Sequence, residues 1–219
     1  MIILAHRGHW IEPSEKNSLA AFERAFSAGH GVELDVRDRS GDLVISHDPP
    51  DQTAPLFETV LALYRDAGLP GRLAVNIKAD GLADRVVEEL DRFGAVAQAF
   101  AFDMSVPDML AYVRGPAPVF TRFSEYEPDP ALYGQCEGVW IDSFLGPHAP
   151  AERAIEDLKR GKAVALVSPE LHKMPYQVAW AAWAHAFRSA GIDKRYSGQL
   201  MVCTDFPAEA NDVFAGVAA

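Results

Sequence analysis

The sequence predicts an α/β protein in which residues 1–219 form a single (β/α)8 barrel domain. Two observations support this fold class. Short apolar runs with β-strand character alternate with longer stretches of helical period, and glycine or proline separates them. Eight such units would have about 27 residues each, which is small but sufficient for eight parallel strands with helices outside. An open, doubly wound sheet is the alternative that the pattern leaves open.

Nine apolar runs are the expected strands. They span residues 2–6, 31–36, 42–47, 72–78, 97–103, 118–123, 138–143, 163–170 and 199–205. The tight turn RDRSGD joins 31–36 to 42–47, so these two runs count as one unit. The expected helices span residues 17–29, 55–68, 82–94, 106–115, 129–135, 150–161, 176–191 and 207–216, of which 129–135 has the weakest pattern. Several of them end in glycine, as helix C-termini commonly do, and Asn17 or Ser18 can cap the first.

Composition limits the classes of partner. Hydrophobic residues make up 49% of the chain and charged residues 23%, as in globular proteins with a core. The net charge of −11 argues against a nucleic-acid partner and against an anionic membrane surface. The first apolar run is too short for a signal peptide, and no run approaches the roughly 18 apolar residues of a membrane-spanning helix. We therefore expect a cytoplasmic protein without stable membrane insertion, in which Cys136 and Cys203 are packing residues.

Two acidic residues on the second strand indicate a metal site. Glu33 and Asp35 are two positions apart, so both side chains point to the same side of the strand. Two carboxylates facing the inside of a parallel barrel repel each other unless a cation neutralises them. A hard divalent cation with oxygen ligands, Mg²⁺ or Ca²⁺, would do so.

Cationic and titratable residues follow the neighbouring strands. His6 and His47 can act as a general base and a general acid, because imidazole titrates near neutral pH. Arg7 offers a planar fork to phosphate oxygens, and Lys78 offers a point charge. Together with a metal site these residues suit phosphoryl chemistry. No glycine-rich nucleotide-binding motif is present.

Two further residues follow the run 163–170. Glu170 and His172 are candidate contacts to a phosphate-containing substrate, because the site of a barrel lies where its strands end. Trp180 and Trp183 either form a wall for that substrate or pack against the barrel, and their spacing on one helical face favours packing.

The motifs HRG, NS-LAAFERAFSAG, ELDV and HD, in this order and spacing over residues 5–48, resemble the glycerophosphodiester phosphodiesterase family, within the broader phosphatidylinositol-phospholipase-C-like barrels. The resemblance is weaker from residue 49 onward, where NIK and MVCTDFP are similar to later motifs of the family. It implies a (β/α)8 barrel with a divalent cation. It also implies that His6 and His47 are the acid–base pair, that Arg7 and Lys78 contact phosphate, and that the ELD carboxylates are metal ligands.

Three departures from the family pattern bear on function. Asn76 stands where the family has a third acidic ligand, so its neutral amide oxygen predicts weaker metal binding, unless Asp103 or Asp142 takes that place. Lys16 stands where the family has Glu directly before Asn, which leaves the role of Glu15 open. The small subdomain that many members carry after His-Asp is missing, which predicts a more open mouth and tolerance of bulkier substrates.

The sequence thus predicts a metal-dependent phosphodiesterase that hydrolyses a small-molecule, glycerophosphodiester-like substrate. Two alternatives stay open. One is an enzyme that cyclises the phosphodiester without a metal, as a lyase does, and the other is a barrel that binds phosphate esters without catalysis.

Overall fold

A computed structural model describes residues 1–146 and 150–217 of the chain. Strands and helices alternate in the order that a (β/α)8 barrel requires, so the protein belongs to the predicted fold class. The chain forms two compact units, which are described separately: an N-terminal unit of residues 4–120, and a C-terminal unit of residues 1–3 together with the part of the chain from 121 onward.

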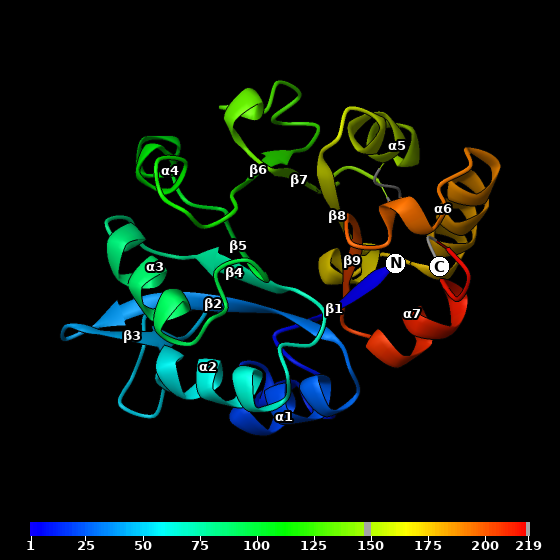
Figure 1. Cartoon of the computed structure of the whole chain (residues 1–219). Coiled ribbons are helices and arrows are strands. Elements are labelled where there is room, and N and C mark those ends of the chain that lie inside the picture. The colour runs from blue at the N-terminus through cyan, green and yellow to red at the C-terminus, as the bar shows by residue number, and fades with distance from the viewer. Residues whose placement is uncertain (147–149, 218–219) are drawn as a thin grey trace. The chain divides into compact units, whose positions relative to one another are not determined.

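The strands of the N-terminal unit are β1 (Ile2–His6), β2 (Gly31–Arg39), β3 (Asp42–Ile45), β4 (Leu73–Ile77) and β5 (Ala99–Phe102). Four of them lie in the order β5-β4-β2-β1 and pair in parallel. The fifth, β3, folds back on β2 as an antiparallel hairpin, as the turn RDRSGD predicted. The helices are α1 (Leu19–Ser27), α2 (Phe57–Asp66), α3 (Ala83–Arg92) and α4 (Val106–Tyr112), and consecutive helices pack on each other (Figure 1).

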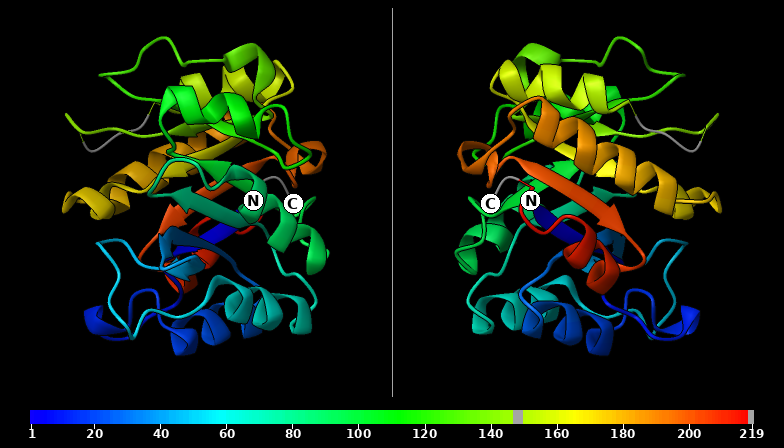
Figure 2. Two further views of the ribbon diagram at one scale, coloured as in Figure 1. Left: turned by 90° about the vertical axis from the view of Figure 1, so that its left-hand side faces the viewer. Right: turned by 90° about the vertical axis from the view of Figure 1, so that its right-hand side faces the viewer.

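The strands of the C-terminal unit are β6 (Phe120–Phe123), β7 (Gly138–Ile141), β8 (Ala163–Val167) and β9 (Leu200–Thr204), in the order β9-β8-β7-β6. Strands β7, β8 and β9 pair in parallel. The helices α5 (Ala151–Lys159), α6 (Gln177–Ser189) and α7 (Pro207–Val213) again pack on their neighbours. The N-terminus lies beside the last described residues of the C-terminal unit (Figure 2), where the amino group of Met1 donates a hydrogen bond to the carbonyl of Val217 at 2.8 Å.

Local chemistry explains where the helices begin and end. The hydroxyl of Ser18 caps α1 by accepting a hydrogen bond from the amide of Ala21 at 3.2 Å. Gly29 and Gly68 follow α1 and α2 with φ of 76° and 84°, the left-handed conformation that ends many helices. These observations confirm the predicted helix ends.

The predicted helix at 129–135 is wrong. Only a single 3-10 turn forms there, η2 (Tyr133–Gln135), and it follows a left-handed Leu132 with φ of 52°. The left-handed backbone at Leu132 interrupts the helical conformation in the middle of the predicted range, so no regular helix forms across it.

The tryptophans of α6 are core residues rather than a substrate wall. Trp180 and Trp183 are fully buried among side chains of the C-terminal unit. The indole of Trp180 donates to the hydroxyl of Ser168 at 2.7 Å, so its polar group is satisfied within the fold. Cys136 and Cys203 are buried, as expected of packing residues. No helix in the described part of the chain is both long and apolar enough to cross a membrane.

Candidate functional site

The end of β1 brings His6 and Arg7 to the acidic strand. His6 lies opposite Glu33 in the parallel pairing of β1 with β2, and the amide of Arg7 donates to the Glu33 carbonyl at 2.8 Å. Arg7 has φ of 57°, which is uncommon for a residue with a side chain and is found preferentially at functional sites. Gly8 follows with φ of 88°, and a Cβ on it would lie 2.8 Å from the main chain and Cβ of Ala21. Only glycine therefore lets the chain pass α1 in this conformation.

Asp35 is the centre of a charged network. Its carboxylate is fully buried, and Oδ2 lies 2.9 Å from Nε of Arg7. The same Oδ2 accepts a hydrogen bond from Nδ2 of Asn17 at 2.9 Å. Oδ1 lies 3.4 Å from Nζ of Lys78, which is also 3.6 Å from Oδ2 of Asp103. Two cations thus compensate a carboxylate that burial alone would disfavour.

Glu33 is bound to the neighbouring strands. It is 2% exposed, and its Oε1 accepts a hydrogen bond from Nδ2 of Asn76 at 3.1 Å. Its Oε2 lies 3.9 Å from Nε2 of His6. Burial, together with the adjacent charge of Asp35, raises the pKa of the Glu33 carboxyl.

His47 stands apart from this network. Its ring is 45% exposed, and Nδ1 lies 3.0 Å from Oδ1 of Asp48. Its link to the site is through the main chain, because the amide of Ser46 donates to the Asp35 carbonyl at 2.9 Å.

Glu170 and His172 lie in the C-terminal unit and have partners there. The Glu170 carboxylate accepts hydrogen bonds from the hydroxyls of Ser168 and Thr204 and, at 3.1 Å, from the amide of Asp205. Nε2 of His172 lies 2.7 Å from Oδ1 of Asp142, whose pKa is raised by burial. Their proposed contact with substrate stays a prediction.

The sequence analysis missed Asn17 as a site residue and considered it only as a helix cap. The available signal was the resemblance, because Asn17 opens the family-like motif NS-LAAFERAFSAG, whereas nothing in the spacing shows that the loop after β1 returns to β2. Glu15, left open above, is a structural residue of that loop. Its carboxylate accepts a hydrogen bond from the amide of Ile11 at 2.7 Å and pairs with Nη2 of Arg24 at 2.8 Å.

Four buried side-chain oxygens in this cluster have no hydrogen-bond donor. They are Oε2 of Glu33, Oδ1 of Asp35, Oδ1 of Asn76 and Oδ1 of Asn17. Oδ1 of Asp35 has the Lys78 ammonium at 3.4 Å, so the two amide oxygens are the acceptors least compensated, at about 1–3 kcal/mol for each buried acceptor without a donor. Within the described residues, no three His, Cys, Asp or Glu side chains group as a metal site, since half of these oxygens belong to amides. The donor set nevertheless fits a hard divalent cation, which takes carboxylate and amide oxygens.

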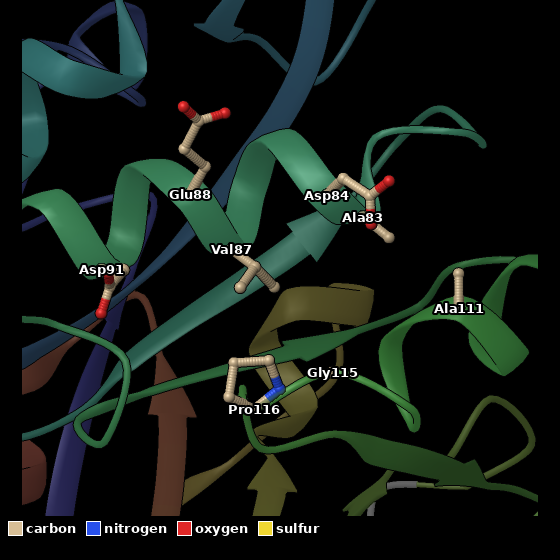
Figure 3. A pocket seen from close by; sticks show the side chains of 8 residues that line it. All are labelled: Ala83, Asp84, Val87, Glu88, Asp91, Ala111, Gly115 and Pro116. Atoms are coloured by element: carbon tan, nitrogen blue, oxygen red, sulfur yellow. The ribbon is translucent and has the colours of Figure 1, made fainter.

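The N-terminal unit has two surface hollows of different character. One, of about 430 Å³, lies between residues 16–19 and the loop after β3, and is lined by Lys16, Asn17 and Asp48 among others. The other, of about 380 Å³, lies between α3 and α4 (Figure 3). Three carboxylates of α3 line the second hollow and would repel a phosphodiester, whereas the first includes a residue of the Asp35 network.

Fold and site together define an α/β barrel protein with an oxygen-rich acidic cluster flanked by an arginine and a lysine. No protein-family model and no curated protein matches the sequence. Solved structures do match. A candidate glycerophosphodiester phosphodiesterase from Galdieria sulphuraria aligns over 98% of this chain and 97% of its own, with 14% identity and a TM-score of 0.75.

Two other structures place this likeness in a wider group. A glycerophosphodiester phosphodiesterase from Parabacteroides distasonis aligns over 100% of this chain and 98% of its own, with 16% identity and a TM-score of 0.68. A Ca²⁺-dependent phosphatidylinositol-specific phospholipase C from Streptomyces antibioticus aligns over 97% and 96%, with 11% identity and a TM-score of 0.51. The chain therefore has the fold of the glycerophosphodiester phosphodiesterases, as the sequence resemblance implied.

Proposed function

We propose that this protein is a phosphodiesterase that hydrolyses a glycerophosphodiester-like small molecule with the aid of a divalent cation. The observation that carries the proposal is the cluster that β2 forms with the ends of β1 and β4. It combines a buried pair of acidic residues, buried oxygens without a hydrogen-bond donor, an arginine, a lysine and a histidine. The fold shared with phosphodiesterases agrees with this chemistry but does not by itself establish it.

The charges of the cluster suit a phosphodiester. Glu33, Asp35 and Asp103 carry three negative charges when ionised, against the two positive charges of Arg7 and Lys78. The net charge of the cluster is then negative and would repel an anionic substrate. A divalent cation would make it positive, which attracts a phosphodiester with one negative charge.

The side chains of this chain have separate roles in the proposed reaction. Arg7 uses Nε for Asp35, which leaves its two terminal nitrogens as donors to phosphate oxygens. One of the two histidines, His6 or His47, accepts the proton of the attacking hydroxyl while its oxygen bonds to phosphorus. The other gives a proton to the alcohol oxygen as its bond to phosphorus breaks. The attacking hydroxyl is that of water or of the substrate itself, and the latter yields a cyclic phosphate that water then opens.

The cation would be held by oxygens of Glu33, Asp35 and Asn76. When bound, it would supply positive charge to the phosphate oxygens as charge develops there. The Ca²⁺ dependence named for the Streptomyces phospholipase C agrees with such a cation. Whether Mg²⁺ or Ca²⁺ is used is taken up below.

One observation favours a second candidate, a metal-independent cyclising enzyme. Asp35 is already paired with both Arg7 and Lys78, so part of the acidic charge is balanced without a metal. The two candidates differ in their response to a chelator. Release of the alcohol from a glycerophosphodiester, which carries the hydroxyl that cyclisation needs, should disappear after EDTA treatment and return with Mg²⁺ or Ca²⁺. Activity that persists without a metal would support the second candidate and refute the first.

Histidine variants test catalysis against binding. His47→Ala and His6→Ala should abolish turnover and leave binding of a phosphate ester largely intact. A barrel that only binds phosphate esters would show no turnover for these substitutions to remove. His185→Ala, on the exposed side of α6, is the matched control and should keep full activity. Turnover that survives in His47→Ala would contradict the role assigned to that residue.

The remaining properties belong to the same proposal. The substrate class would give the protein a place in lipid breakdown in the cytoplasm, without a nucleic-acid partner and without stable membrane insertion. Glu170 and His172 would contact the substrate. The short β3–α2 connection would admit bulkier alcohols than glycerol, and a preference for the smallest glycerophosphodiesters would count against this.

A further inference from the structure

We infer that Asn17 supplies a fourth oxygen to the cation site of Glu33, Asp35 and Asn76, and that this makes the site prefer Ca²⁺ to Mg²⁺. The inference rests on the metal-binding part of the proposed function. It assigns a ligand on the loop after β1, outside the strands that carry the other three.

The conformation of Asn17 brings its side chain to the acid pair. The φ angle of Asn17 is 62°. Its main-chain amide donates a hydrogen bond to the carbonyl of Arg7 at 2.9 Å, which closes the loop between the two residues. Arg7 and Asn17 both reach Oδ2 of Asp35, at 2.9 Å each. Two residues in the left-handed region are thus joined at their main chains and converge on one buried carboxylate. Asparagine adopts the left-handed region more readily than most residues, so this backbone conformation suits Asn17.

Capping of α1 does not explain the Asn17 side chain. Ser18 is the cap, and its hydroxyl accepts the amide of Ala21. Nδ2 of Asn17 is used by Asp35, and Oδ1 is buried without a donor. A residue needed only to orient Asp35 would not require a buried acceptor, which is unfavourable unless something electrophilic binds it.

Asn76 repeats the same arrangement on β4. Its Nδ2 donates to Glu33 at 3.1 Å, and its Oδ1 is also buried without a donor. Asn76 lies opposite Asp35 in the pairing of β2 with β4, so the two amides flank the same acid pair. Each asparagine therefore gives its amide nitrogen to one carboxylate and leaves its amide oxygen for a ligand.

The composition of this set favours Ca²⁺. Two carboxylates and two amide oxygens provide four protein oxygens with only two negative charges. Ca²⁺ takes six to eight oxygens, including amide carbonyls, in flexible geometry, whereas Mg²⁺ keeps several waters and uses one or two carboxylates. Asn17 also lines the surface hollow of about 430 Å³.

Isothermal titration of the full-length, EDTA-treated protein with Ca²⁺ and with Mg²⁺ tests the inference. Asn17→Gly removes the side chain and keeps the left-handed backbone, which alanine would strain. Asn17→Asp restores an oxygen but not the amide nitrogen. Asn211→Ala, at an exposed position of α7, is the control. Thermal unfolding without metal verifies that each variant folds.

The wild type should bind Ca²⁺ at least tenfold more tightly than Mg²⁺. Asn17→Gly should lose at least tenfold in Ca²⁺ affinity, and Asn17→Asp should bind Ca²⁺ at least as tightly as the wild type. Unchanged affinity in Asn17→Gly would overturn the ligand role. Equal losses in the Gly and Asp variants would also overturn it, because the amide nitrogen would then be what matters. Tighter binding of Mg²⁺ by the wild type would overturn the Ca²⁺ preference.

Failure of the proposed function gives a different result. Binding that depends on Asn17 without any phosphodiester hydrolysis would refute the enzyme and keep the ligand assignment. Hydrolysis by a protein whose Ca²⁺ affinity does not change when Asn17 is replaced would refute the ligand assignment and keep the enzyme. Absence of any cation binding would refute both the metal-dependent mechanism and the role of Asn17.

Discussion

Replacing Gly8 by alanine tests whether the backbone after β1 is fixed by its contact with α1. Gly8 has φ of 88°, and an added Cβ would lie 2.8 Å from both the carbonyl carbon and the Cβ of Ala21. The amide of His9 also donates to the Ala21 carbonyl at 2.9 Å, so the chain cannot move away without losing that bond. The variant must therefore adopt a disfavoured conformation and displace main chain.

The two penalties can be estimated separately. A left-handed alanine is unfavourable by about 1–2 kcal/mol, and overpacking adds about 1–3 kcal/mol. The free energy of unfolding of Gly8→Ala should therefore fall by about 2–5 kcal/mol. At roughly 2–4 °C per kcal/mol for a chain of this size, the melting temperature should fall by about 4–20 °C.

Gly29→Ala is the matched control. Gly29 follows the same helix with φ of 76°, and a Cβ there would meet no atom within 4 Å. Only the conformational penalty applies, so the loss should be about 1–2 kcal/mol. Urea unfolding followed by circular dichroism measures both variants. Equal losses would refute the argument that the approach to Ala21 fixes this backbone.

Three further predictions concern charge. Asp35→Asn should lower the free energy of unfolding by about 3–5 kcal/mol in urea titrations, because it leaves two cations without their buried partner. A loss below about 1 kcal/mol would show that the ion pairs of Asp35 are solvated. Saturating Ca²⁺ at about 100 times its Kd should stabilise the protein by about 2.7 kcal/mol, visible as a rise in melting temperature that EDTA reverses; no shift would argue against a site in the native state. Burial raises the pKa of Glu89, so its ionisation opposes folding, and the stability present while it is protonated is lost as pH rises through its folded pKa. Glu89→Gln should therefore gain stability relative to the wild type between pH 4 and pH 7 in urea unfolding, and a constant difference across that range would contradict the assignment.

Acid–base catalysis by two histidines requires His47 and His6 to act on the same phosphodiester. The structure gives them different surroundings. His6 is 13% exposed beside Glu33, whereas the His47 ring is 45% exposed and bound to Asp48. His47 directly follows Ser46, whose main-chain amide donates a hydrogen bond to the Asp35 carbonyl.

The sequence by itself determined the strand and helix alternation and the position of the acid pair. Strand periodicity is local, so Glu33 and Asp35 could be placed on one side of β2 from their spacing alone. Adjacent parallel strands end at the same edge, which brought His6, Arg7 and Lys78 to that pair in the prediction and in the structure. The resemblance over residues 5–48 implied the same fold that the solved structures share.

Only the tertiary structure decided which groups are paired and which are left without partners. The loop after β1 returns Asn17 to Asp35, and the left-handed backbone at Leu132 interrupts the helix predicted there. Lys78, which was expected to contact phosphate, forms ion pairs with both Asp35 and Asp103. These outcomes depend on backbone conformations and on contacts between residues far apart in the chain. Such contacts are set by packing and burial, which no local pattern of residue types encodes.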